Sequence, residues 1–199
     1  MLKISELGRT MLETISVLAI VGVLSVGGFG IIGKAMQTHR EAQLLSDTAD
    51  LARYAKKFAC KYEEAYRTYT LFLYKANAYP TNLYYDSGSN TYVGIMDSIY
   101  QINGDNDYFN INISNLSDDS CIKLATADWG TGRTSGMIGV AIGNSDVGSY
   151  FKSCTSDCAD KDFAVSSLSS NYPMSVDKAV ENCTNGSNNT IQLWYKGCK

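Results

Sequence analysis

The stretch Gly8-Arg9-Thr10-Met11-Leu12-Glu13, together with the uncharged run from Thr14 to Gly33 that follows it, decides how the rest of this chain is organised. A helix of about 20 residues is long enough to span the roughly 30 Å hydrocarbon core of a bilayer. Desolvating the carboxylate of Glu13 at the start of such a helix would cost about 2.5–3.5 kcal/mol, so we expect this acid to have a function and a cationic partner. Cleavage between Gly8 and Arg9 would create an α-amino group one helical turn before Glu13, and that group could supply the charge.

The uncharged run admits two simpler interpretations. A secretory signal peptide has an apolar core of about 7–15 residues followed by a small-residue cleavage site. This run is longer, carries its acid in front and lacks an Ala-x-Ala-like end. A plain single-pass anchor stays open as an alternative, because Lys34, His39 and Arg40 would flank the run.

The composition of the remaining chain indicates one exported globular domain. The formal net charge of −3 gives no basic balance that would favour nucleic acid. The 14 tyrosines, 17 glycines and only 2 prolines favour β-structure with polar turns. An even number of cysteines in an exported domain predicts disulfides without fixing their pairing. The 6 cysteines, all of which follow the uncharged run, are Cys60, Cys121, Cys154, Cys158, Cys183 and Cys198.

An amphipathic helix is predicted directly after the uncharged run. Apolar and small residues recur at spacings of three and four, which is one face of an α-helix, and the opposite face is charged. The pattern weakens after Tyr62 and ends at Tyr79-Pro80, because a residue before proline is pushed out of the α region. The apolar face comprises Leu44, Thr48, Leu51, Ala55, Phe58, Tyr62 and Ala65, and the charged face Asp50, Arg53, Lys56, Lys57 and Lys61.

The second half of the chain predicts an antiparallel sheet with helices on one face. We expect a linking loop from Thr81 to Asp107, with one short helix near Ile95 to Tyr100. Two short helices are expected from their capping serines, one from Ser117 through Ser120 and one from Ser175 to Cys183. Strands are predicted from the alternation of residues at Tyr108–Ile113, Ser135–Ile142 and Thr190–Tyr195.

The N-terminal residues resemble a known family. A short polar leader ending in Gly8, a glutamate at the fifth position after it and a long apolar run look like the class III signal of type IV prepilins and pseudopilins. The resemblance implies that a prepilin peptidase at the inner membrane cuts after Gly8 and methylates the new amino terminus. It also implies that Glu13 compensates the N-terminal charge of a neighbouring subunit in a filament. Arg9 stands where the family usually carries a hydrophobic residue.

The C-terminal half resembles the major pilins of the type IVb group. The resemblance rests on residues 121–126, Cys-Ile-Lys-Leu-Ala-Thr, on Asp-Trp-Gly at 128–130, and on a final strand from Asn188 to Trp194. It implies an α+β pilin fold, in which a long N-terminal helix packs against an antiparallel sheet and a disulfide closes the C-terminal region.

The same resemblance implies a disulfide between Cys121, just before a central strand, and Cys183. Cys154 and Cys158 are close enough to close a local loop, and Cys60 with Cys198 then follows by elimination. The main rival pairs Cys183 with Cys198 and leaves Cys60 with Cys121.

No catalytic or metal-binding constellation is found in the sequence, so we expect neither an enzyme nor a bound cofactor. The single histidine, His39, is expected to be an exposed or interfacial helix residue. Asp105 and Asp107 are expected in a solvated turn, since no Glu completes an EF-hand. Cys154 and Cys158 lack a nearby His for zinc, and Gly130-Thr131-Gly132-Arg133 lacks the Lys of a P-loop.

The expected organisation is a leader at 1–8, a membrane-spanning and filament-core helix at 9–33, and a globular domain at 34–199. The resemblance implies a structural subunit of an extracellular type IV pilus, used for adhesion, motility, conjugation or uptake. Its expected partners are copies of itself, the prepilin peptidase, the pilus assembly platform and, before assembly, the inner membrane. Two alternatives stay open: a pseudopilin of a type II secretion system, and a membrane-anchored periplasmic binding module that never polymerises.

Overall fold

The computed structural model describes residues 32–58, 69–104, 108–130, 136–143, 164–167 and 172–197, and for 164–167 it gives only the course of the backbone. The chain divides into two compact units, Met1–Arg40 and Glu41–Lys199. Residues 32–58 form a helix, called the N-terminal helix below. Within the described ranges, no helix combines the length and apolar character that a membrane crossing requires. The predicted leader and residues 9–31 of the predicted membrane helix lie outside the described residues.

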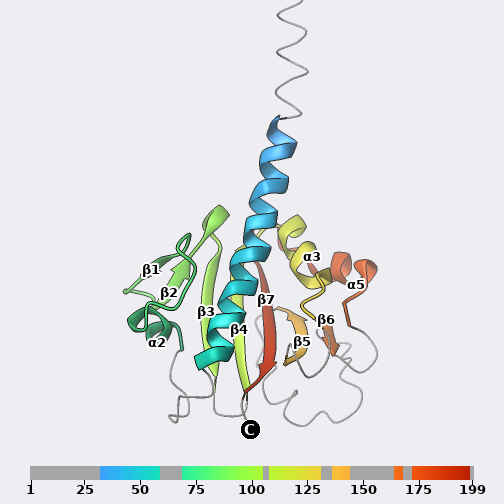
Figure 1. Ribbon diagram of the computed structural model, residues 1–199. Helices are drawn as coiled ribbons and strands as arrows, with labels where there is room; N and C mark the ends of the chain where they lie inside the picture. Colours follow the sequence, from blue (N-terminus) through green and yellow to red (C-terminus); the bar gives the residue numbers. More distant parts are fainter. Residues whose placement is uncertain are drawn as a thin grey trace, which may run out of the picture. The chain divides into compact units, whose positions relative to one another are not determined.

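One antiparallel sheet forms the framework of the second unit (Figure 1). Its described strands are β1 (Tyr84–Asp86), β2 (Thr91–Val93), β3 (Ile99–Gly104), β4 (Tyr108–Leu116), β5 (Met137–Ile142), β6 (Ala164–Ser167) and β7 (Asn189–Lys196). Their order across the sheet is β1-β2-β3-β4-β7-β5-β6. The three predicted strands are confirmed as β4, β5 and β7. The last of them lies in the middle of the sheet, where it pairs with both β4 and β5.

The core lies between this sheet and the 41–58 portion of the N-terminal helix, which runs across one face of the sheet (Figure 1). Leu44, Leu51 and Ala55 are no more than 1% exposed, so the predicted apolar face is confirmed over this portion. Thr48 is also buried, and its polar group is satisfied there because the hydroxyl donates to the carbonyl oxygen of Leu44 at 2.7 Å. Tyr62 and Ala65 of the predicted face lie outside the described residues. Alternate residues of the central strands complete the core: Ile102, Phe109, Ile111, Ile113, Ile191 and Leu193.

A second helix, α2 (Tyr69–Lys75), packs against β2 and β3. The sequence pattern predicted helix as far as Tyr79, and this boundary is wrong. The chain turns at Asn77, whose φ of 50° is left-handed, and the amide of Ala78 donates back to the carbonyl of Leu73. Tyr79 is instead stacked on Tyr92, with ring centroids 5.0 Å apart.

The prediction of a linking loop from Thr81 to Asp107 is wrong over the described residues 81–104. This segment contains β1, β2, β3 and a single turn of 3₁₀ helix, η1 (Ile95–Asp97). The Asp86-Ser87-Gly88 turn connects β1 to β2, and the Asp86 carboxylate accepts from the amide of Gly88 at 3.0 Å. β1 and β2 have three residues each, which is too short to show an alternating pattern. β3 has six residues and buries Tyr100 and Ile102 in alternation, so its pattern was present in the sequence and was missed.

Two further helices, α3 (Asp118–Thr126) and α5 (Val176–Asn182), cover the same face of the sheet. Their buried residues Leu124 and Ala179 belong to the same core as the N-terminal helix. Both predicted caps are confirmed: Ser117 accepts from the amide of Ser120, and Ser175 accepts from the amide of Lys178. The helix after Ser117 is longer than predicted, so Cys121 lies inside α3 and not just before a strand.

Candidate functional site

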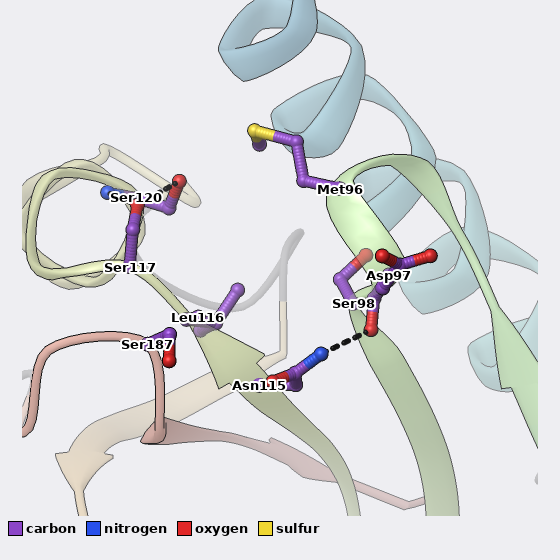
Figure 2. A pocket seen from close by; sticks show the side chains of 8 residues that line it. All are labelled: Met96, Asp97, Ser98, Asn115, Leu116, Ser117, Ser120 and Ser187. Atoms are coloured by element: carbon purple, nitrogen blue, oxygen red, sulfur yellow. Dashed lines mark hydrogen bonds between the residues drawn. The ribbon is translucent and has the colours of Figure 1, made fainter.

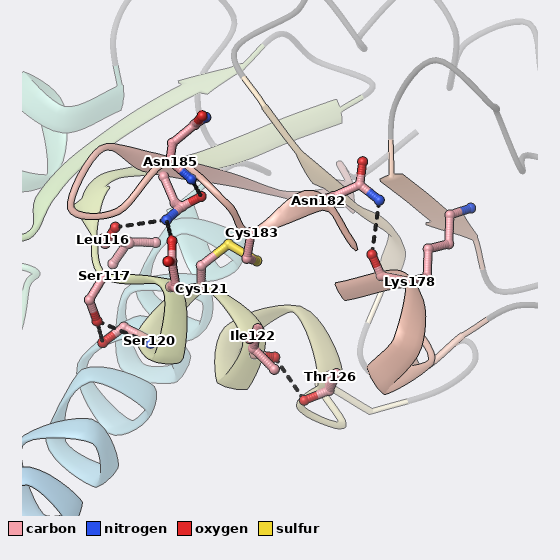
Figure 3. The surroundings of a disulfide bond; sticks show 12 residues. Leu116, Ser117, Ser120, Cys121, Ile122, Thr126, Lys178, Asn182, Cys183 and Asn185 are labelled. Carbon is pink, nitrogen blue, oxygen red and sulfur yellow. Dashed lines mark hydrogen bonds between the residues drawn. A yellow bond between two sulfur atoms is a disulfide. The ribbon is translucent and has the colours of Figure 1, made fainter. Parts of the chain in front are cut away.

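The residues predicted for processing and assembly, Gly8, Arg9 and Glu13, lie outside the described residues, and so do the cysteines at 60, 154, 158 and 198. The predicted site residues that the structure does bring together are Cys121 and Cys183. They form a disulfide with their Cα atoms 5.8 Å apart, and both are buried (Figure 3). This bond confirms the favoured pairing and excludes the rival one. It connects α3 to the end of α5, so the two helices are held as one disulfide-closed region.

Asn189, at the start of β7, holds this region on the sheet. The residue is 1% exposed, and its side-chain amide donates to the carboxylate of Asp118 at 2.6 Å and to the carbonyl of Leu116 at 3.3 Å. Its side-chain oxygen accepts from the amide of Asn185. No local sequence pattern marks Asn189, because the partners of its side chain are separated from it by as many as 73 positions.

A second set of hydrogen bonds joins the segment after α3 to the segment before α5. The indole of Trp129 donates to the carbonyl of Leu124 at 3.0 Å, and the backbone amide of Trp129 donates to the hydroxyl of Tyr172. That hydroxyl donates in turn to the carbonyl of Ala127 at 3.3 Å. Burial raises the pKa of Tyr172 to about 12, so the phenol stays protonated and able to donate near neutral pH. The disulfide-closed region therefore has polar as well as covalent cross-connections.

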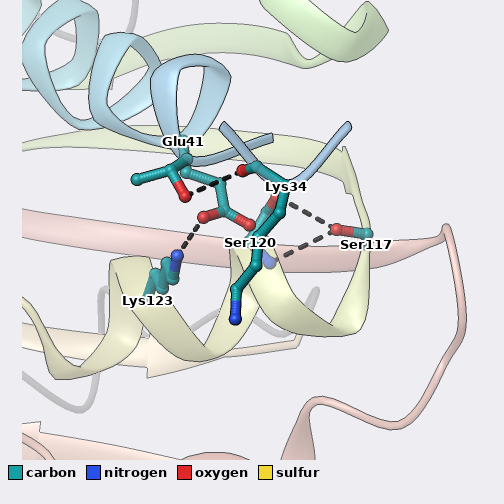
Figure 4. A network of polar contacts seen from close by, with 6 residues as sticks. Lys34, Glu41, Ser117, Ser120 and Lys123 are labelled. Atoms are coloured by element: carbon teal, nitrogen blue, oxygen red, sulfur yellow. Dashed lines mark hydrogen bonds and ion pairs between the residues drawn. The ribbon is translucent and has the colours of Figure 1, made fainter. Parts of the chain in front are cut away.

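An ion pair joins the N-terminal helix to α3 within the second unit (Figure 4). The carboxylate of Glu41 is almost fully buried, and it pairs with the ammonium of Lys123, whose side chain is 46% exposed. Removing the partner of a buried charge leaves that charge without compensation. The pair therefore favours one placement of α3 against the helix, and a sequence pattern could not reveal it, because the two residues are 82 positions apart.

A cavity of about 310 Å³ opens between residues 96–98 and the first turn of α3 (Figure 2). Its polar lining consists of Asp97, Asn115, Ser98, Ser117, Ser120 and Ser187. The side-chain amide of Asn115 donates to the backbone carbonyl of Asp97 at 2.8 Å, so it connects the end of β4 to η1. No sequence motif pointed to this cavity, because its members come from three separate parts of the chain.

The remaining candidates from the sequence are placed as follows. His39 is exposed on the N-terminal helix, as predicted, while Asp105 and Asp107 lie outside the described residues. Gly130 has a φ of 86° and its amide donates to the carboxylate of Asp128 at 2.9 Å, which is a local turn. In the described ranges there is no group of three or more His, Cys, Asp or Glu residues that could hold a metal ion.

The arrangement just described is a helix held under an antiparallel sheet, with a cross-linked helical region and a polar cavity beside it. Comparison of the chain with protein-family models, with curated proteins and with solved structures gives no match.

Proposed function

We propose that this chain is the structural subunit of a type IV pilus, made as a precursor, cut after Gly8 and polymerised through its N-terminal helix into an extracellular fibre. The observation that carries the proposal is Glu13, an acid at the start of a run without any charge, five residues after a leader that ends in glycine. An acid in a membrane helix is costly and marks a functional position. The amino group released by cleavage gives that acid a partner of opposite charge.

The described part of the N-terminal helix supports this proposal in two ways. In the second unit its apolar face is buried under the sheet, so the helix is fixed firmly to the globular part. In the first unit Ile32 and Met36 lie four residues apart, which places them on one helix face, and they are 57% and 52% exposed. Two large apolar side chains exposed on one helix face can be buried by another apolar surface. In the proposed fibre, helices of neighbouring subunits provide it.

The disulfide-closed region is the second support. A subunit of an extracellular fibre works outside the cell, where disulfides form and persist. The Cys121–Cys183 bond, the Asn189 hydrogen bonds and the Trp129–Tyr172 contacts give α3 and α5 a fixed position without relying on a large core of their own. In the proposed fibre this region faces outwards and contributes to its surface.

The test is N-terminal sequencing of the mature protein combined with electron microscopy of material sheared from the cell surface. We expect the mature chain to begin at Arg9 and to be the main component of the fibres. Glu13→Ala should be cleaved normally yet give few or no fibres, because the acid that sets the register is gone. The matched control is Glu6→Ala, which removes an acid from the leader and should leave assembly unchanged.

Three results would contradict the proposal. An intact Met1 with no fibres would favour the membrane-anchored binding module. Cleavage after Gly8 without any extracellular fibre would favour the pseudopilin of a type II secretion system. Normal fibres from Glu13→Ala would refute the charge pairing.

A further inference from the structure

The cavity between η1 and α3 is open to solvent on one side and has the size of a small-ligand site. Its volume of about 310 Å³ is at the lower end of the range of roughly 300–1,000 Å³ seen for small-molecule sites. Figure 2 shows the labelled side chains on opposite sides of it, with Asp97 and Ser98 on one side and Ser117 and Ser120 on the other. The site is thus bounded by two structural elements whose relative position the β3–β4 ladder fixes.

Three residues that line the cavity have a left-handed backbone. Met96, Asp97 and Asn115 have φ values of 57°, 56° and 61°, and none of them is glycine. Aspartate and asparagine adopt this conformation more readily than other residues with a Cβ atom, so the strain lies chiefly at the bulky Met96. A strained backbone conformation persists only where the surrounding structure holds it, and such residues cluster at functional and ligand sites. Here the strained segments are held by Asn115, which donates to the Asp97 carbonyl, and by Ser98, whose hydroxyl donates to the Ile95 carbonyl at 2.8 Å.

The lining offers hydrogen-bonding groups that a ligand can reach. Asp97 and Ser187 are both exposed, so the carboxylate and the hydroxyl are accessible to a ligand from solvent. The hydroxyl of Ser117 donates to the oxygen of Ser120 at 3.0 Å, which leaves the proton of Ser120 free. The cavity therefore presents strong acceptors together with hydroxyl donors. A ligand that carries several adjacent hydroxyl groups can use both.

The same lining argues against other ligand classes. It contains the carboxylate of Asp97 and no cation, so a phosphate, sulfate or carboxylate group would be repelled. The lining contains no aromatic ring. A flat aromatic ligand would need such a ring to stack on, and a quaternary ammonium group would need several of them to form a cage. Met96 and Leu116 supply a small apolar surface, enough for the carbon skeleton of one sugar ring.

We propose that this cavity binds one residue of a neutral saccharide, with adjacent ring hydroxyls donating to the Asp97 carboxylate and accepting from Ser120 and Ser187. The proposal does not depend on polymerisation, because every residue in it belongs to the second unit. A fibre subunit and a membrane-anchored module could both carry such a site.

The test uses the full chain in a detergent without a sugar headgroup and saturation-transfer NMR at millimolar concentrations of four probes. These are methyl α-D-glucopyranoside, methyl α-D-mannopyranoside, methyl β-D-galactopyranoside and N-acetyl-D-glucosamine. We expect at least one of them to bind, and Asp97→Asn to weaken that binding about tenfold or more, because it loses a charged acceptor. Asparagine tolerates the left-handed backbone, so this variant should keep the wild-type unfolding temperature.

A control variant and a second probe decide between outcomes. Glu181→Gln removes an exposed carboxylate from α5, outside the cavity, and should leave sugar binding unchanged. Ser187→Ala should weaken it by about two- to tenfold, the effect of one neutral hydrogen bond. Failure of all four sugars to bind would overturn the proposal, as would binding that Asp97→Asn leaves intact. Binding of methylammonium chloride alone, in an Asp97-dependent manner, would make this an organic-cation site and also overturn it.

Discussion

The disulfide between Cys121 and Cys183 should account for a large part of the stability of the globular unit. The bond joins residues 62 positions apart. The chain-entropy relation for a closed loop of that length gives a loss of about 4 kcal/mol at 25 °C when the cross-link is removed. A domain of this size has a total free energy of unfolding of roughly 5–15 kcal/mol. The double variant Cys121→Ala/Cys183→Ala should therefore lose about a third or more of it.

Urea unfolding of the full chain, followed by tryptophan fluorescence, measures this loss. Trp129 and Trp194 both belong to the second unit, so the signal reports on the globular unit. With a denaturant dependence of about 2 kcal/mol per molar urea, the midpoint should fall by about 2 M. The matched control is Cys154→Ala/Cys158→Ala, which removes the predicted bond between Cys154 and Cys158. That bond would close a very short loop, so the same relation gives a loss of only about 2 kcal/mol in the free energy of unfolding. A midpoint shift below about 0.5 M for the first variant, or equal shifts for both, would refute the reasoning from loop length.

Two other predictions concern the carboxyl group of Asp47 and the backbone position of Gly104. Burial raises the pKa of Asp47 above its ordinary value of 3.8. The side-chain amide of Asn82 donates to the carboxylate and partly offsets this increase, whereas the negative charge of Asp50 raises the pKa further. The folded state therefore binds the proton of the Asp47 carboxyl group more tightly than the unfolded chain does. Above the folded-state pKa the ionised carboxylate lowers the free energy of unfolding. This loss disappears as the pH falls through the folded-state pKa towards 3.8. The free energy of unfolding of the wild type should rise relative to that of Asp47→Asn when the pH is lowered from neutral to about 4.5, and a constant difference across that range would contradict this. Gly104→Ala should lower stability by about 1–3 kcal/mol, because a Cβ there would lie 2.7 Å from Phe109 Cβ and 2.8 Å from a ring carbon of Tyr69. Gly88→Ala, whose Cβ would meet only the Asp86 carboxylate at 3.4 Å, is the control, and equal unfolding temperatures of the two variants would count against the steric argument.

The sequence was sufficient where a structure repeats a local pattern. Leu44, Leu51 and Ala55 are spaced as one helix face and are buried as one. Ser117 and Ser175 are good caps in their local context, and both accept the expected amide hydrogen bond. These features depend on residues within a few positions of each other, which is the range over which a sequence pattern is informative.

The sequence was insufficient where distant partners decide the structure. Glu41 and Asp47 are polar residues on the buried side of the helix, and their partners Lys123 and Asn82 are 82 and 35 positions away. The predicted end of β4 was too early for a related reason. The strand bends at Asn115 and then resumes pairing, with Leu116 opposite Asn189. The cavity depends on the same bend, so both were missed together.

The position of β7 links these observations. Among the described strands, β7 is the one that pairs with both halves of the sheet, because it lies between β4 and β5. Pairing it with β4 brings together residues 73 to 88 positions apart, from Leu116 opposite Asn189 to Tyr108 opposite Lys196, which is entropically costly and slow. The Cys121–Cys183 bond and Asn189 act at the same end of this pairing, since Cys183 precedes β7 by a short turn and Asn189 contacts the residues that precede Cys121. Once that bond has formed, the free loop between β4 and β7 is reduced to the few residues on either side of it. The disulfide-closed region therefore does more than hold two surface helices together: by shortening this loop it restricts the registers in which β7 can pair with β4.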